Sequence, residues 1–305
     1  MDTPSTGPAG QIVFDGADGL TLRGEIWGTG PVQLTFVHGA GMAVSAYRAA
    51  FAPLSGKARV HALNARGHGG SGIPPGMSYD LARADLRKYV RERMAPPVIL
   101  AGHSFGALLS MALAAEAPEI ASGLLLLDPL VPWRRCEAWP PAGQGPDQAL
   151  IASTRTRRDE WPSRAEAEAW LRSRGSYRAW SEQAFAAFCE TALVDQPDGS
   201  VRLACPPQIE VETYEGRPGT EIFAWAERAQ APAVILRGRE SVQCPSANAE
   251  DLAKAYRLGS VLSVKGAHTF PMEQPGETGR VLALALTILA GGAGEHGVPV
   301  RSPAP

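Results

Sequence analysis

The first half of the chain alternates short apolar runs with longer stretches in which apolar residues recur at helical spacing. Apolar runs bounded by turn residues predict strands, and the helical spacing predicts helices. The four consecutive leucines at 124–127 are so apolar that both faces of that strand must be covered. Strands that alternate with helices predict an α/β fold with a mostly parallel central sheet flanked by helices. The predicted strands span 32–37, 60–63, 98–102 and 124–127, and the predicted helices span 43–54 and 80–94.

Further elements lie at the two ends of this pattern. Alternating apolar and polar residues around Asp18-Gly19 predict a hairpin over residues 11–28. Towards the end of the chain, the pattern predicts strands at 233–236 and 261–264 and a closing helix at 277–289.

The alternation stops after Asp128, and a segment of different character follows. Residues 130–230 are rich in proline, tryptophan and arginine, and we interpret them as a mostly helical cap inserted after the sixth strand. The cap tryptophans are expected either to pack a core or to line an apolar pocket. The arginines at 155, 157 and 158 are expected on a solvated face. The α/β core then comprises residues 11–129 and 231–290. Residues 1–10 and 291–305 are expected to be disordered.

Composition narrows the classes of partner. The formal charge of −2 over 305 residues gives no electrostatic reason to expect binding to nucleic acid or to an anionic membrane. The first residues show no signal-peptide pattern, and the apolar run 281–290 is too short to span a bilayer. We therefore expect a cytoplasmic monomer or homodimer that acts on a small molecule. The cysteines are scattered along the chain, at Cys136, Cys189, Cys205 and Cys244. Their spacing predicts neither a zinc site nor a disulfide framework, and we expect no metal or cofactor.

The strongest chemical motif is Gly102-His103-Ser104-Phe105-Gly106. It follows a predicted strand and precedes a helical pattern, which is the context of a nucleophile elbow. The glycines allow a turn so tight that side chains there would collide. The turn presents the Ser104 hydroxyl at a helix N-terminus, where developing negative charge is favoured. We therefore predict Ser104 as a nucleophile.

A serine nucleophile needs a base and an acid that orients the base. His268 lies in a loop directly after the last predicted strand, at the edge where catalytic groups collect in open α/β sheets. His103 lies inside the elbow and is expected to be a supporting residue at most. Two acids compete, Asp128 at the end of the leucine strand and Glu240 after the strand at 233–236. We favour Asp128, because an unpaired buried carboxylate is expensive, and keep Glu240 as the alternative.

An oxyanion hole needs two backbone N–H groups. The N–H of Phe105 is one candidate, and the glycine-containing loop after the strand at 32–37 supplies the other. We choose Ala40 there, with Gly41 or Met42 possible if the register differs. The expected substrate-binding residues are Gly39, Gly41, Met42, Trp133 and Phe270.

Taken together, these motifs resemble the α/β-hydrolase fold superfamily over roughly residues 11–290. The order of serine, acid and histidine along the chain is also that of the family. The turn at 66–71 lacks the spacing of a phosphate loop, so we interpret it as structural. The matching segments are His38-Gly39, Arg66-Gly67-His68-Gly69-Gly70-Ser71, the elbow, Gly266-Ala267-His268 and Glu273-Gln274-Pro275.

The chain departs from the family pattern at two positions. Asn64 replaces a common aspartate before the arginine turn, and Ser241 stands where the catalytic acid commonly falls. The second departure is a further reason to favour Asp128.

The resemblance implies a serine hydrolase that cleaves an ester-like bond of a small, apolar molecule through an acyl-enzyme on Ser104. Cap segments at 161–164, 177–180 and 203–207 are similar to esterase-like hydrolases of microbial metabolism. Two alternatives use the same scaffold, a hydrolase of carbon–carbon bonds and a cofactor-independent oxygenase. A non-catalytic binding protein is a third alternative.

Overall fold

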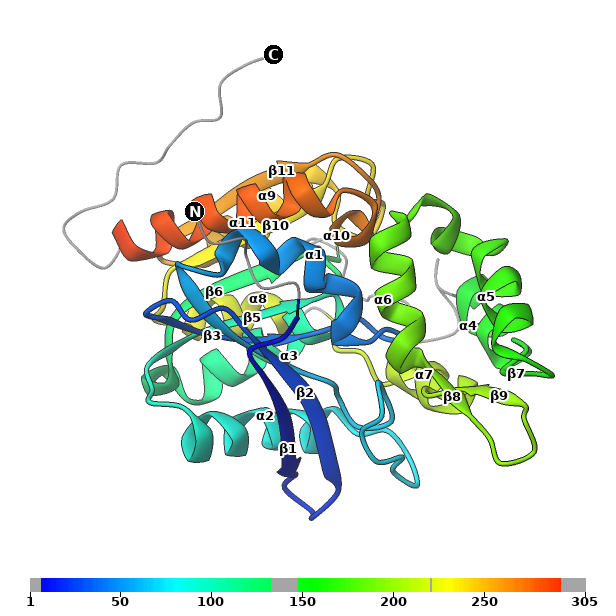
Figure 1. Cartoon of the computed structure of the whole chain (residues 1–305). Helices are drawn as coiled ribbons and strands as arrows, with labels where there is room; N and C mark the ends of the chain where they lie inside the picture. The colour runs from blue at the N-terminus through cyan, green and yellow to red at the C-terminus, as the bar shows by residue number, and fades with distance from the viewer. Residues whose placement is uncertain (1–6, 133–147, 220, 292–305) are drawn as a thin grey trace.

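A central eight-stranded sheet organises the described part of the chain (Figure 1). The computed structural model describes residues 7–132, 148–219 and 221–291. The strands lie in the order β1-β2-β4-β3-β5-β6-β10-β11; β1 and β2 form the predicted hairpin, β2 and β4 are antiparallel, and the other neighbours are parallel. The predicted α/β fold is thereby confirmed. The strands are β1 (Gly10–Asp15), β2 (Thr21–Trp27), β3 (Val32–Val37), β4 (Ala58–Leu63), β5 (Val98–His103), β6 (Ala121–Leu127), β10 (Ala233–Gly238) and β11 (Gly259–Val264).

Helices cover both faces of this sheet (Figure 1). All residues of β5 and β10 are buried, as expected for strands covered on both sides. The hydrophobic core accordingly divides into two clusters, one for each face. The first packs the sheet against α2 (Tyr79–Arg93), α3 (Phe105–Glu116), α8 (Glu221–Arg228) and α9 (Ser246–Ala255), and the second packs it against α1 (Arg48–Phe51) and α11 (Pro275–Gly291).

The predicted elements are present, with small differences in their bounds. The helix expected over 43–54 is divided into η1 (Val44–Tyr47), α1 and η2 (Ala52–Leu54). Pro53 lies in η2, where its missing N–H does not support a continuous α-helix. The strand β1 begins at Gly10 and α11 ends at Gly291. Both residues belong to regular elements, although the sequence analysis placed them in the disordered ends. The remainder of the expected tail, 292–305, lies outside the described residues.

The insertion contains strands that the sequence did not predict. A small antiparallel sheet of order β7-β9-β8 accompanies its helices. Its last helix, α8, packs against α3 and α9 and so joins a layer of the core, although it lies within the range predicted for the cap. The other described elements are α4 (Gln148–Arg155), β7 (Glu160–Trp161), α5 (Arg164–Arg172), η4 (Gly175–Ala179), α6 (Glu182–Ala192), β8 (Leu193–Asp195), β9 (Val201–Leu203) and α7 (Pro207–Glu215); η3 (Pro118–Ile120) and α10 (Phe270–Glu273) lie in the core.

Two of the cap tryptophans pack a core. Trp161 and Trp180 are 1% and 2% exposed and belong to the same hydrophobic cluster as α6. Neither of them lines the cavity beside Ser104. Of the two roles left open for the tryptophans, these residues take the packing role.

Arg66 fastens the glycine-rich turn to the scaffold. Its guanidinium is fully buried and forms ion pairs with Asp85 of α2 and with Asp18 of the hairpin. Asp85 also accepts a hydrogen bond from the N–H of Ala17 at 2.8 Å. These contacts occupy the arginine with internal partners, which agrees with a structural turn.

Removing the Asp85 carboxylate should destabilise the protein, because it leaves the buried charge of Arg66 poorly compensated. We expect Asp85→Ala to lower the free energy of unfolding by about 3–5 kcal/mol, measured by urea denaturation. Asp80→Ala in the same helix is the matched control, since Asp80 is 85% exposed in its pair with Arg83. The control should cost less than about 1 kcal/mol. Equal losses for the two variants would contradict the structural role of Arg66.

Candidate active site

Ser104 occupies a strained turn between β5 and α3. Its backbone has φ 51° and ψ −113°, a combination that residues with side chains rarely adopt. A Cβ atom on Gly102 would lie 2.2 Å from the carbonyl carbon of Gly106, and one on Gly106 would lie 2.0 Å from the carbonyl oxygen of Val37. Only glycine fits at these two positions, which confirms the steric argument made from the motif.

A buried carboxylate lies behind the histidine. His268 lies in the loop between β11 and α10, and its Nδ1 is 2.7 Å from Oδ2 of Asp128. Asp128 is fully buried and follows β6 with φ 40°. Its Oδ1 accepts the N–H of Gly238 at 2.8 Å, and its Oδ2 accepts the hydroxyl of Ser241 at 2.5 Å. Three donors therefore compensate the charge that burial removes from water.

Glu240, the alternative acid, has no contact with the histidine among the described residues. Its side chain is exposed, and its backbone N–H donates to the carbonyl of Gly266 at 3.0 Å. Within the described residues, its carboxylate makes no hydrogen bond or ion pair with His268. The geometry therefore favours Asp128 over Glu240 as the partner of the imidazole.

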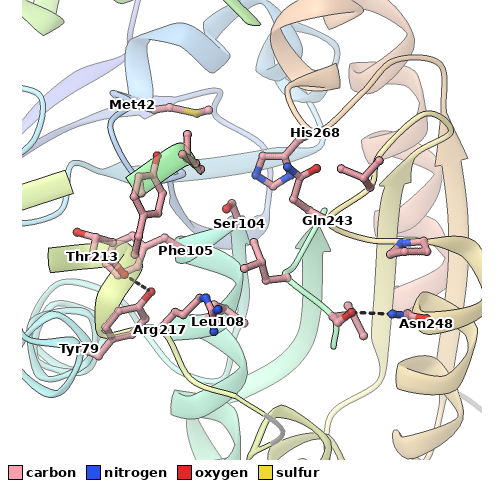
Figure 2. A pocket seen from close by; sticks show the side chains of 17 residues that line it. Met42, Tyr79, Ser104, Phe105, Leu108, Thr213, Arg217, Gln243, Asn248 and His268 are labelled. Carbon is pink, nitrogen blue, oxygen red and sulfur yellow. Dashed lines mark hydrogen bonds between the residues drawn. The ribbon is translucent and has the colours of Figure 1, made fainter. Parts of the chain in front are cut away.

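Ser104 and His268 line one cavity (Figure 2). Because Nδ1 of His268 donates to Asp128, the imidazole is held in the tautomer whose Nε2 accepts a proton. No hydrogen bond joins the Ser104 hydroxyl to this imidazole in the part of the chain that the structure describes. Catalytic hydrogen bonds are often long before substrate binds and shorten afterwards.

The loop that follows β3 has most of its N–H groups occupied. The N–H of Gly39 donates to the hydroxyl of Tyr47 at 3.2 Å, and the N–H of Gly41 donates to Nε2 of His68 at 3.0 Å. The N–H of Met42 donates to the carbonyl of Gly39 at 3.1 Å. The register alternatives at Gly41 and Met42 are therefore disfavoured, because those N–H groups have internal partners.

Two N–H groups next to the serine remain available. Neither Ala40 nor Phe105 uses its backbone N–H in a hydrogen bond within the described residues. Phe105 is the first residue of α3, where an N–H has no partner inside the helix. Both residues also line the cavity. The sequence analysis chose the N–H groups of these same two residues for an oxyanion hole, and that role stays a prediction.

Buried neutral histidines support the loops around the site. Burial lowers the pKa of His38 to about 3 and also lowers the pKa of His68 and of His103, so all three are uncharged at neutral pH. Nε2 of His103 donates to the backbone carbonyl of His268 at 2.9 Å, and its Nδ1 accepts the hydroxyl of Tyr47 at 2.7 Å. His103 thus fixes the backbone that carries His268. Sequence reasoning missed Tyr47, which lies in no motif.

The cavity beside Ser104 has a volume of about 520 Å³ and is largely apolar. Tyr79, Thr213, Gln243 and Asn248 bring polar groups to it, and Arg217 brings a guanidinium (Figure 2). Its apolar wall comes from Leu108, Leu130, Val131, Leu150, Val242 and Pro245.

The predicted substrate-binding residues are only partly at this cavity. Met42 lines it, whereas Gly39 and Gly41 are not among the described residues of its wall. The expectation for Phe270 is wrong: this side chain is fully buried in the core, because the chain enters α10 immediately after His268 and turns the ring inward. Trp133 lies outside the described residues.

The cap contributes an ion pair next to the loop that follows β3. Glu210 of α7 is buried and bonds to Arg157, so this arginine does not belong to a solvated face. The hydroxyl of Tyr214 donates to Glu210 at 2.7 Å. A Cβ on Gly41 would lie 2.5 Å from the Glu210 carboxyl carbon, so the cap and the loop are in close contact.

The described residues contain no group of three or more His, Cys, Asp and Glu side chains that could hold a metal ion. Cys189, Cys205 and Cys244 are buried free thiols whose pKa is raised by burial, and Cys136 lies outside the described residues. In the same part of the chain, no helix is both long and apolar enough to cross a membrane.

Several solved structures share this fold. E-2-(acetamidomethylene)succinate hydrolase superposes with a TM-score of 0.76 at 22% identity, covering 91% of this chain and 98% of that chain. The thioesterase domain from the curacin biosynthetic pathway gives 0.73 at 19% identity, covering 91% and 99%. An esterase of M. tuberculosis gives 0.72 at 19% identity, covering 92% and 93%. At such identities the likeness establishes the fold.

Sequence comparison adds a family match. A stretch of 70 residues is 34% identical to sn-1-specific diacylglycerol lipase ABHD11 of Mus musculus, which is 23% of this chain and 23% of that protein. The chain thus matches less than a quarter of that relative's length. The model described as the alpha/beta hydrolase family matches residues 36–281, a range that includes Ser104, Asp128 and His268. The chain therefore belongs to the alpha/beta hydrolase family.

Proposed function

We propose that this protein is a serine hydrolase that cleaves an ester-like bond of a small, apolar molecule through an acyl-enzyme on Ser104. The observation that carries the proposal is the arrangement of three groups. His268, bonded to Asp128, and the strained Ser104 line one cavity together with Ala40 and Phe105, whose backbone N–H groups have no internal partner among the described residues.

The first half-reaction transfers the acyl group to the enzyme. His268 takes the hydroxyl proton of Ser104 at Nε2, and the serine oxygen attacks the substrate carbonyl carbon. Asp128 stabilises the imidazolium that forms. As the tetrahedral intermediate collapses, the bond to the leaving alcohol breaks and His268 returns the proton to that alcohol.

The second half-reaction releases the acid. A water molecule loses a proton to His268 and attacks the acyl carbon, and the bond to the Ser104 oxygen then breaks. His268 gives the proton back to the serine. In both halves, the N–H groups of Ala40 and Phe105 donate to the oxygen that gains negative charge.

The cavity supports an apolar substrate. Its wall is mainly aliphatic and aromatic, so burying hydrocarbon there is favourable. An ester bond also agrees with the name of the mouse relative, a lipase, although the two chains match over a short stretch.

The alternatives predict different reactivity. A carbon–carbon bond hydrolase on this site would cleave diketones in preference to esters, and a cofactor-independent oxygenase would consume oxygen without ester turnover. A binding protein needs no proton-transfer pair. We favour ester hydrolysis over a binding role because the Asp128–His268 hydrogen bond is in place at 2.7 Å.

Ser104→Ala should abolish turnover, because it removes the atom that forms the acyl-enzyme. We expect kcat on p-nitrophenyl esters to fall by at least about 10³-fold and labelling by a fluorophosphonate probe to disappear. Thermal unfolding should be unchanged or nearly so. Ser263→Ala, at an exposed position on β11, is the matched control and should behave as wild type. Undiminished activity of Ser104→Ala would overturn the proposed function.

Asp128→Asn should lower kcat by about 10⁴-fold, because the amide no longer holds the imidazole in the required tautomer. Glu240→Gln should change kcat by less than about twofold, since this exposed side chain has no contact with His268 among the described residues. Steady-state kinetics on the same ester measures both. The reverse ranking of the two variants would identify Glu240 as the acid.

Acyl chain length should govern the rate. Each added methylene buried in the cavity should raise kcat/KM by up to about fourfold, until the cavity is filled. A series of p-nitrophenyl esters of increasing acyl length measures this dependence. Leu150→Trp, at a lining residue that is 45% exposed, should move the optimum to shorter chains by occupying space. A rate independent of acyl length would show that the acyl group binds elsewhere.

A further inference from the structure

The Ser241 hydroxyl lies against the oxygen of Asp128 that faces the histidine. Its Oγ is 2.5 Å from Oδ2 of Asp128, and that same Oδ2 is 2.7 Å from Nδ1 of His268. The Ser241 hydroxyl and the His268 imidazole thus bond to the same carboxylate oxygen of Asp128. Ser241 is 6% exposed, so this contact is made away from solvent.

The surroundings determine which way this hydroxyl points. The backbone N–H of Cys244 donates to the Ser241 Oγ at 3.3 Å, which occupies a lone pair. A second acceptor, Oε1 of Gln243, is 3.5 Å away and is therefore the weaker choice. The hydroxyl hydrogen is directed at Asp128, and a hydrogen bond to a charged acceptor is among the strong ones.

Asp128 needs such support because of its backbone. It adopts φ 40°, which a residue with a side chain keeps only where its surroundings enforce it. The N–H of Asp128 donates to the carbonyl of Leu236 at 2.7 Å, and the N–H of Gly238 donates to its Oδ1. Ser241 completes the set by fixing the other oxygen, which is the one His268 uses.

We propose that Ser241 is a positioning residue that holds the Asp128 carboxylate in the orientation that His268 requires. This inference rests on the proposed function, because it assigns a role within the same site. Ser241 acts through Asp128.

The first experiment measures the rate at which a fluorophosphonate labels Ser104, together with kcat and KM on a p-nitrophenyl ester. Ser241→Ala should lower the labelling rate and kcat by about 10- to 100-fold with KM little changed. Ser241→Thr keeps the hydroxyl and should recover most of the loss. Ser246→Ala, an exposed serine in the same region, is the matched control. Thermal unfolding of each variant reports any general effect on the fold.

A double-mutant cycle separates positioning from a structural role. In the Asp128→Asn background, Ser241→Ala should change kcat by less than about threefold, because there is no carboxylate left to hold. A loss as large as in the wild-type background would overturn the inference, since it would show that Ser241 acts independently of Asp128.

The outcomes also distinguish this inference from the proposed function. If the wild-type protein does not react with the probe, the proposed function fails and the role of Ser241 fails with it. If the wild-type reacts and Ser104→Ala does not, the proposed function stands. Wild-type rates in Ser241→Ala would then overturn the positioning role alone.

Discussion

The buried carboxylate of Asp128 is the group around which the site is assembled. A carboxylate without partners at this depth would cost several kcal/mol, and donors from different segments offset that cost. Gly238, Ser241 and His268 are 110, 113 and 140 residues away from Asp128 along the chain, yet all donate to it. The strand order β6-β10-β11 explains this convergence, because parallel neighbours end at the same edge of the sheet. The sheet topology thus brings together the three donors that compensate the buried charge of Asp128.

Much of this arrangement was predictable, because it depends on local physics. β5 and β10 are buried along their whole length, so their sequences are continuously apolar and identify parallel strands. The elbow was predictable because glycine is required where a Cβ would meet backbone atoms at about 2 Å. His268 was found from its place after the last strand. In each case a few adjacent residues carry the whole signal.

The other features of the fold and the site depend on tertiary contacts that cannot be read from the sequence. The strands β7, β8 and β9 have two or three residues each, too few to show alternation. Phe270 is two residues from His268, but the start of α10 turns it into the core. The sequence placed Arg157 on a charged surface, but the structure pairs it with the buried Glu210. The packing of α7 determines where Glu210 lies, and the sequence alone does not show that packing. Tertiary partners decide each of these outcomes.

The loop that follows β3 is shaped by histidines that must stay uncharged. His68 accepts the N–H of Gly41 through a lone pair of Nε2, which protonation would abolish. The same applies to His38, whose Nε2 accepts the N–H of Ala65 at 3.0 Å. Burial lowers the pKa of His38 from 6.5 to about 3, so the unfolded chain binds more protons between these values. This contribution to stability is complete above pH 6.5 and declines as the pH falls toward 3. The conditions that favour the folded state therefore also keep the N–H of Gly41 bonded to His68, whereas the N–H of Ala40 has no hydrogen-bond partner among the described residues.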